Sequence, residues 1–196
     1  IGLGASEADL RRLLRRELTT VVPGIYVNHN GPLTWEQRAW VGVHAHAPAA
    51  LGWESAMPRP PRGGLIQVAV GHRSRITPVP GVHARRMAHL AERLHPLGAP
   101  PRIRLEHAAI DLAITKRDVA AQFRVLADAC QTRETSAAAI AAALRSRQRV
   151  PGRRLLAELL ADLEEGACSV LEREYLLLER RHGCRGPSAS AVTSCP

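Results

Sequence analysis

The residues with the clearest chemical character are four arginines near the start of the chain. In the segment 6–16, leucines recur at the spacing of one helix face, and arginines occupy the opposite face: Arg11, Arg12, Arg15 and Arg16. Ser6 is suited to cap the helix, with Asp9 at the position from which a side chain reaches back to the cap. The pattern predicts a helix with one packing face and one cationic face, which would contact phosphates.

A β-hairpin is expected directly after this helix. Leu18–Val22 and Ile25–Val27 are rich in β-branched residues, and Pro23-Gly24 between them suits a type II turn. A solvated surface would explain an arginine-rich helix that stood alone. A cationic helix followed by a hairpin is typical of a winged helix-turn-helix. We therefore predict that this part of the chain binds double-stranded DNA. Thr19 and Thr20 in the wing are expected to add phosphate contacts.

Composition also favours a polyanionic partner. The chain has 196 residues, a formal net charge of +9 and a pI near 10.8. Arginine supplies 26 of the 27 basic residues, a bias that also fits a GC-rich bacterial genome. From Pro58 to Arg104 there are nine arginines and one acid, Glu92. We expect four of these arginines to contact DNA as well: Arg73, Arg75, Arg85 and Arg86. A solvated loop and an acidic partner protein are the alternatives for this segment.

The sequence lacks recognisable motifs for catalysis, cofactors and metals. His44 and His46 lie two apart, and on a helix such side chains diverge by about 200° and cannot share an ion. The sequence contains no Ser/His/Asp motif, P-loop or dinucleotide-binding glycine motif. We therefore expect no cofactor, no metal site and no catalytic residue.

The cysteines and the hydropathy pattern indicate a cytoplasmic protein. Cys130, Cys168, Cys184 and Cys195 show no paired spacing and are expected to be free thiols. No apolar run approaches the length of a membrane span, and no secretory leader is evident. The first residue is Ile, and the predicted first helix would need preceding helices to pack against. We therefore expect an incomplete first domain.

The pattern along the chain predicts an α+β protein: a partial winged helix-turn-helix (1–33) and a small mixed sheet packed with helices (34–165). Thr34 begins a helix that runs towards His46 and restarts after Pro48. Expected strands are Leu65–Val70, Arg75–Val79 as an edge or interrupted strand, and a third from Gly81. Expected helices are Arg104–Ile114, Arg117–Cys130, Ser136–Arg147 and Arg153–Glu165.

Two local features have structural interpretations. Gly52–Ala56 lacks the flanking glycines of a nucleophile elbow and is expected to start a helix with Trp53 packed. Glu106 and Asp111 lie in a helix near many arginines, so we expect them to form structural ion pairs.

Several segments, in this order, resemble actinobacterial proteins with an AbiEi-type antitoxin amino-terminal domain. The segments that carry the resemblance are Ser6–Arg12, Pro23–Val27, Leu33–Ala39, Glu54–Ala56 and Arg102–Asp111. The resemblance extends to about Gly183. It implies a winged helix-turn-helix that binds operator DNA and represses a type IV toxin–antitoxin operon. The implied functional partner is a nucleotidyltransferase-like toxin that is neutralised without a stable complex.

Many such proteins continue into a domain resembling very-short-patch-repair endonucleases. Residues 166–183 resemble the first helix of that domain, with Glu172 matching its acid. The later acids that would bind Mg²⁺ do not occur in the chain. A single carboxylate cannot assemble such a metal site, so we expect no cleavage activity. Residues 184–196 resemble low-complexity coil, and we interpret them as a frameshifted tail or an ordinary disordered terminus.

These observations predict a DNA-binding, antitoxin-like transcriptional regulator. Two alternatives stay open: a truncated remnant of a very-short-patch-repair-like DNA endonuclease, and a non-enzymatic protein-interaction module whose basic segment binds an acidic toxin.

Overall fold

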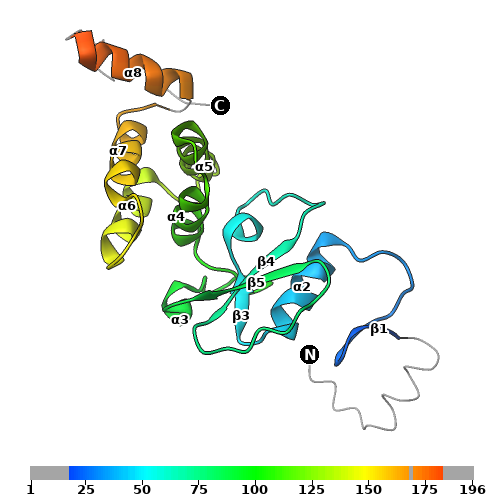
Figure 1. Cartoon of the computed structure of the whole chain (residues 1–196). Helices are drawn as coiled ribbons and strands as arrows, with labels where there is room; N and C mark the ends of the chain where they lie inside the picture. The colour runs from blue at the N-terminus through cyan, green and yellow to red at the C-terminus, as the bar shows by residue number, and fades with distance from the viewer. Residues whose placement is uncertain (1–17, 168–169, 183–196) are drawn as a thin grey trace. The chain divides into compact units, whose positions relative to one another are not determined.

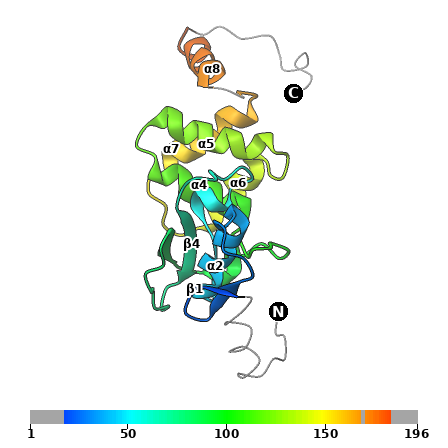
Figure 2. The same ribbon diagram turned by 90° about the vertical axis from the view of Figure 1, so that its right-hand side faces the viewer.

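The computed structural model describes residues 18–167 and 170–182. The described chain groups into two compact units. The first contains 18–55 and Pro61–Arg102, and the second contains Ala56–Pro60 together with the described residues from Ile103 onward. Figures 1 and 2 show the elements of each unit.

The predicted hairpin is present at the start of the first unit. β1 (Thr19–Val22) pairs antiparallel with β2 (Ile25–Val27), with Thr19 opposite Val27. Gly24 has a φ of +84°, which is the conformation that a type II turn requires at its third position. The Pro23-Gly24 pair therefore forms the turn for the predicted reason.

Helix α2 (Trp35–Ala45) begins where the sequence predicts. The Thr34 hydroxyl accepts a hydrogen bond from the Gln37 amide (3.2 Å), and the Gln37 side chain accepts one from the Thr34 amide (2.9 Å). These two bonds form a complete capping box.

The predicted restart of this helix after Pro48 is wrong. The chain instead enters β3 (Ala49–Leu51), which pairs antiparallel with β4 (Ile66–Gly71). Proline lacks an amide hydrogen and disfavours helical conformation in the residue before it, so the helix does not continue.

The three-stranded sheet has the order β3-β4-β5 and is mixed, as expected. β5 (Val82–Met87) runs parallel to β4. The segment Arg75–Val79, predicted as an interrupted strand, is not a strand. Its Pro78 and the following Pro80 have no amide hydrogen to donate to a neighbouring strand. The third strand is the one predicted from Gly81.

Helix α2 covers one face of this sheet, as Figure 1 shows. A Cβ atom at Gly42 would lie 3.1 Å from Val68 and 3.3 Å from Val82, so glycine permits the close approach. Ile66, Val68 and Val70 are fully buried. The short turn η1 (Trp53–Ala56) follows β3, and α3 (Leu90–Arg93) follows β5. Trp53 is buried, as predicted.

The second unit is helical and confirms the helices predicted from Arg104 to Glu165 to within two residues. Its elements are α4 (Leu105–Thr115), α5 (Val119–Gln131), α6 (Ala137–Ser146), α7 (Arg153–Glu164) and α8 (Val170–His182). Asp118 and Ser136 cap α5 and α6 through their side chains. The core is apolar and includes Phe123, Ile110, Leu126 and Ile140.

One predicted ion pair is found in this unit. Asp111 on α4 accepts two hydrogen bonds from Arg147 (2.5 and 3.1 Å), with both side chains largely buried. Glu106 accepts instead from the Thr135 hydroxyl (2.9 Å). No helix in the described parts of the chain is long and apolar enough to cross a membrane.

Candidate nucleic-acid interface

The predicted DNA-contact residues occupy three regions of the chain. The first group, Arg11, Arg12, Arg15 and Arg16, lies outside the described residues. The other groups, on the hairpin and around β5, both belong to the first unit.

Thr19 and Thr20 are exposed on β1, but successive strand residues point to opposite faces. The Thr19 hydroxyl lies 2.6 Å from Asn30 Oδ1 and donates to it. Thr20 lies opposite Tyr26, and its hydroxyl has no hydrogen-bond partner among the described residues. Thr20 is therefore better placed than Thr19 to contact a ligand.

The hairpin contacts α2 through a polar link. His29 Nε2 lies 2.9 Å from Gln37 Nε2, which makes the amide the donor and the ring nitrogen the acceptor. Since Gln37 also completes the capping box, the same side chain ties the start of α2 to the chain that leaves the hairpin.

Three of the four predicted arginines of the second cluster are exposed: Arg73, Arg75 and Arg86. Arg73 and Arg75 lie in the segment 72–81, which leaves the carboxyl end of β4, and Arg86 lies opposite Val70 near the same end of β5. Parallel strands bring their carboxyl ends to one edge of a sheet. Among the described residues, no carboxylate forms an ion pair with these three arginines. We call these three residues the arginine edge.

Arg85 differs from its neighbour Arg86. Its guanidinium carbon lies 4.3 Å from the centre of the buried Trp53 ring, so the cation stacks on the indole. Adjacent residues of a strand point to opposite faces, which separates Arg85 from Arg86. The sequence predicted both as DNA contacts, but only Arg86 is exposed.

The first unit carries a net positive charge. Its described residues include eight arginines and three acids, Glu36, Glu54 and Glu92. Glu36 lies 3.3 Å from Arg62, and its pKa is lowered chiefly by a backbone hydrogen bond and also by the Arg62 charge. Glu92 lies 3.1 Å from His89. Glu54 lies 3.4 Å from the Gln67 amide. Each acid thus has a local partner, and none of these partners belongs to the arginine edge.

The histidines that the sequence placed in one motif have separate environments. His44 is exposed and stacks on Trp40, with ring centres 5.2 Å apart. His46 is buried, and its two ring nitrogens each lie 2.9 Å from a backbone carbonyl oxygen. Sequence reasoning considered His46 only as a metal ligand. It therefore missed this arrangement, which depends on a contact 31 residues away.

Other candidate groups lie in the second unit. Glu172 is exposed on α8. Among the described residues, no three His, Cys, Asp or Glu side chains are grouped as metal ligands. Cys130 is half-buried on α5, and burial raises the pKa of its thiol.

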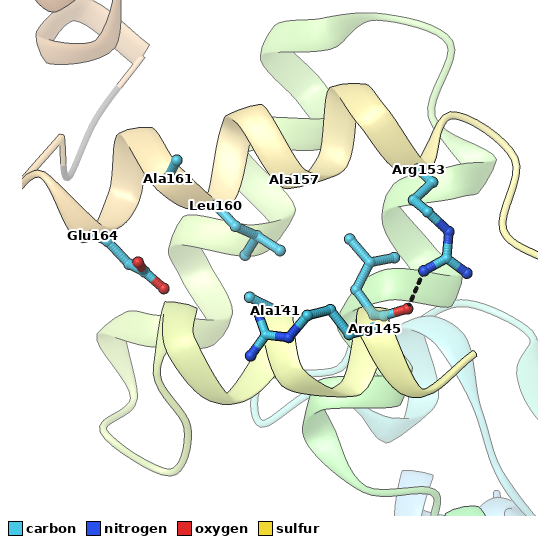
Figure 3. A pocket seen from close by; sticks show the side chains of 8 residues that line it. Ala141, Arg145, Arg153, Ala157, Leu160, Ala161 and Glu164 are labelled. Carbon is cyan, nitrogen blue, oxygen red and sulfur yellow. Dashed lines mark hydrogen bonds between the residues drawn. The ribbon is translucent and has the colours of Figure 1, made fainter. Parts of the chain in front are cut away.

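A groove of about 300 Å³ lies between α6 and α7. Figure 3 shows Ala141, Ala157 and Leu160 along it, with Arg153 Nη1 donating to the Leu144 carbonyl (2.7 Å) at one end. Most of the lining residues are apolar, and the charged ones are Arg145, Arg153 and Glu164. None of the predicted site residues lines this groove.

Comparison with known proteins gives one finding on the fold. No family model matches the chain, and neither does any curated protein. The structure is similar to the crystal structure of the Rv2827c protein from Mycobacterium tuberculosis, with a TM-score of 0.51 and 19% sequence identity. The match covers 91% of this chain and 71% of that one. At this identity the likeness concerns the fold, and the chain shares an α+β architecture with that protein.

Proposed function

We propose that this chain is a DNA-binding, antitoxin-like transcriptional regulator of a type IV toxin–antitoxin system. The observation that carries the proposal is the arginine edge: Arg73, Arg75 and Arg86 are exposed at one end of two parallel strands. Exposed cations that form no ion pair with a carboxylate among the described residues bind a polyanion because they release the counterions condensed on the phosphates.

The hairpin gives the proposal its second support. A wing is a two-stranded antiparallel ribbon with a tight turn, and β1 and β2 form such a ribbon. The predicted arginine-rich helix immediately precedes it in the sequence. In this proposal the helix and wing make up a partial winged helix-turn-helix, and the arginine edge adds phosphate contacts.

The regulatory role rests on the family resemblance of the sequence. Antitoxins of the AbiEi type repress their own operon, and the resemblance covers most of the chain. The proposal therefore includes the promoter of the chain's own gene as the DNA target and a nucleotidyltransferase-like toxin as the functional partner.

The test measures DNA affinity of the full chain as a function of salt. The ligand is a labelled duplex of about 30 base pairs, three turns of B-DNA, taken from upstream of the gene. A triple variant, Arg73→Ala, Arg75→Ala and Arg86→Ala, removes three cations. Each arginine that binds a phosphate in the wild type should, on removal, flatten the slope of log K against log salt by up to about 0.9.

A matched control separates a local site from a general charge effect. Arg117, Arg124 and Arg149 are exposed in the second unit, and their replacement by alanine removes the same charge. This control should keep the wild-type slope. Equal flattening by both triple variants would reject the arginine edge. Unchanged expression of a promoter reporter with and without the protein would reject the regulatory role.

A further inference from the structure

His46 is a buried histidine that joins two distant parts of the first unit. It follows the last residue of α2 and is only 4% exposed. Its Nδ1 lies 2.9 Å from the carbonyl oxygen of Gly42, and its Nε2 lies 2.9 Å from that of Thr77. Gly42 belongs to the last turn of α2, whereas Thr77 lies in the middle of the segment 72–81.

The two contacts can both be hydrogen bonds in only one protonation state of the His46 ring. A carbonyl oxygen only accepts hydrogen bonds, and a neutral imidazole has one N–H and one acceptor nitrogen. Both contacts are hydrogen bonds only when both nitrogens carry hydrogen, which is the imidazolium form. The neutral ring would leave one nitrogen lone pair facing a carbonyl oxygen in a buried site. The carboxyl end of α2 also carries the negative end of the helix dipole, which favours a cation.

The contact with Thr77 is relevant to the arginine edge because it attaches the segment that carries Arg73 and Arg75. Arg73 and Arg75 precede Thr77 in the same segment. The backbone hydrogen bonds at the two ends of this segment are local, from the Ser74 amide to the Gly71 carbonyl and from the Val82 amide to the Val79 carbonyl. His46 links the middle of the segment to a helix that is distant in sequence.

We propose that His46, as an imidazolium, fastens the segment 72–81 to the end of α2 and so positions Arg73 and Arg75 for polyanion binding. The attachment itself follows from the two contacts alone. The consequence for DNA binding rests on the proposed function. His46 is a positioning residue in this proposal and does not touch the ligand.

The charges on the surrounding elements give the expected pH dependence. Of the strands packed against α2, β3 and β4 carry no charged side chain, and β5 carries His83, Arg85 and Arg86. The hairpin carries Tyr26, with His29 after it. The segment 72–81 adds His72, Arg73 and Arg75, and α2 itself has Glu36, Arg38 and His44. Glu36, at the far end of α2, is paired with Arg62.

Apart from that paired acid, the charged groups on these elements are cations, which oppose protonation of His46. A bound polyanion would reduce this opposition. Binding and protonation should therefore favour each other, because linkage is reciprocal. Affinity for the polyanion should be higher at pH 6 than at pH 8.

The first experiment examines the free, full-length protein. Nitrogen NMR of the His46 ring should show both nitrogens protonated at pH 6. Hydrogen exchange of the hydrogen-bonded amides at the two ends of the segment 72–81, Ser74 and Val82, should accelerate by about tenfold in His46→Gln, because that variant removes a hydrogen bond to a charged group. His44→Gln is the matched control, because His44 is exposed two residues earlier and should leave this exchange unchanged.

A ring with only one protonated nitrogen from pH 6 to pH 8 would overturn the proposal. So would equal exchange in His46→Gln and the wild type. The ring measurement uses the wild-type protein, so it decides the question even where His46→Gln fails to fold.

The second experiment measures affinity for the labelled duplex from pH 6 to pH 8 at constant ionic strength. Wild type and His44→Gln should bind more tightly at low pH, and His46→Gln should lose a large part of that dependence. Exposed histidines such as His72 and His83 contribute equally to all three proteins. Equal pH dependence in all three would overturn the link to binding. Absence of DNA binding by every protein would reject the proposed function, while the exchange result would still test the attachment.

Discussion

Arg85 and Arg86 show how a single strand gives two adjacent arginines different roles. Arg85 stacks on the buried Trp53, whereas Arg86 is exposed at the arginine edge. The sequence presents the two side chains as equivalent cations. The alternation of a β-strand, together with the position of Trp53, separates them.

Single alanine substitutions should separate these roles. Arg86→Ala should flatten the salt slope of DNA binding by up to about 0.9 and leave stability unchanged. Arg85→Ala should destabilise the protein by about 1 kcal/mol because it removes the cation–π interaction with Trp53. Urea denaturation and salt-dependent binding measure the two effects. A reversed result, with Arg85 controlling the slope and Arg86 the stability, would contradict the assignment.

Glu172 tests the expectation that this chain does not cleave DNA. Glu172→Gln should change DNA affinity and unfolding free energy by less than about 0.5 kcal/mol, as is usual at an exposed position. The measurements are duplex binding and urea denaturation, with a plasmid-nicking assay in Mg²⁺ and Mn²⁺. Nicking by the wild type that disappears in Glu172→Gln would support the endonuclease alternative.

The thiol of Cys130 should react slowly at neutral pH. Burial raises its pKa, and the thiolate is the reactive species, so less of it is present at a given pH than for an ordinary thiol. Alkylation by iodoacetamide, followed at this residue by peptide mapping, should increase at a higher pH than in the urea-unfolded protein. An identical pH profile in the folded and unfolded chain would show that burial has no such effect.

At the scale of elements, the second unit depends on contacts between helices as well as on helix propensity. Arg147, just after α6, donates to Asp111 on α4 and also to the carbonyl of His107 (3.1 Å). Arg153, at the start of α7, donates to the carbonyls of Arg147 and Leu144. This chain of bonds connects three helices around the end of α6.

Removing one partner of the buried pair should be costly. Arg147→Met should destabilise the protein by about 3 kcal/mol, because Asp111 is only 14% exposed and would keep an uncompensated charge. The double variant with Asp111→Leu should recover part of this stability. Urea denaturation checks both. Equal destabilisation in the single and the double variant would show that the ion pair itself is not the cause.

At the scale of the whole molecule, the charge distribution bears on the proposed DNA binding. The described first unit has eight arginines against three acids, and the predicted amino-terminal helix adds Arg11, Arg12, Arg15 and Arg16. If both regions contact one duplex, their contributions to counterion release should add.

Replacing these four amino-terminal arginines with alanine should flatten the salt slope by up to about 0.9 for each phosphate that the wild-type side chains neutralise. Combining this variant with Arg86→Ala should flatten it further. Circular dichroism confirms that the variants are folded. A folded quadruple variant with the wild-type slope would exclude the predicted helix face from DNA binding.

The sequence by itself determined the features that depend on neighbouring residues. Pro23-Gly24 forms the predicted turn, Thr34 caps α2 together with Gln37, and the periodicity of the second half predicts α4 to α7. These signals are local because a turn, a cap or a helix face is set by residues a few positions apart.

Only the tertiary structure decided the features that join distant residues. Arg147 and Asp111 are 36 residues apart, and His46 and Thr77 are 31 residues apart. No local sequence pattern predicts either contact. The same holds for the stacking of Arg85 on Trp53, and for the region after Pro48, where pairing with β4 replaces the expected helix. In each case tertiary packing determines which partner the side chain or segment contacts. Local secondary-structure propensity is too weak to override that packing.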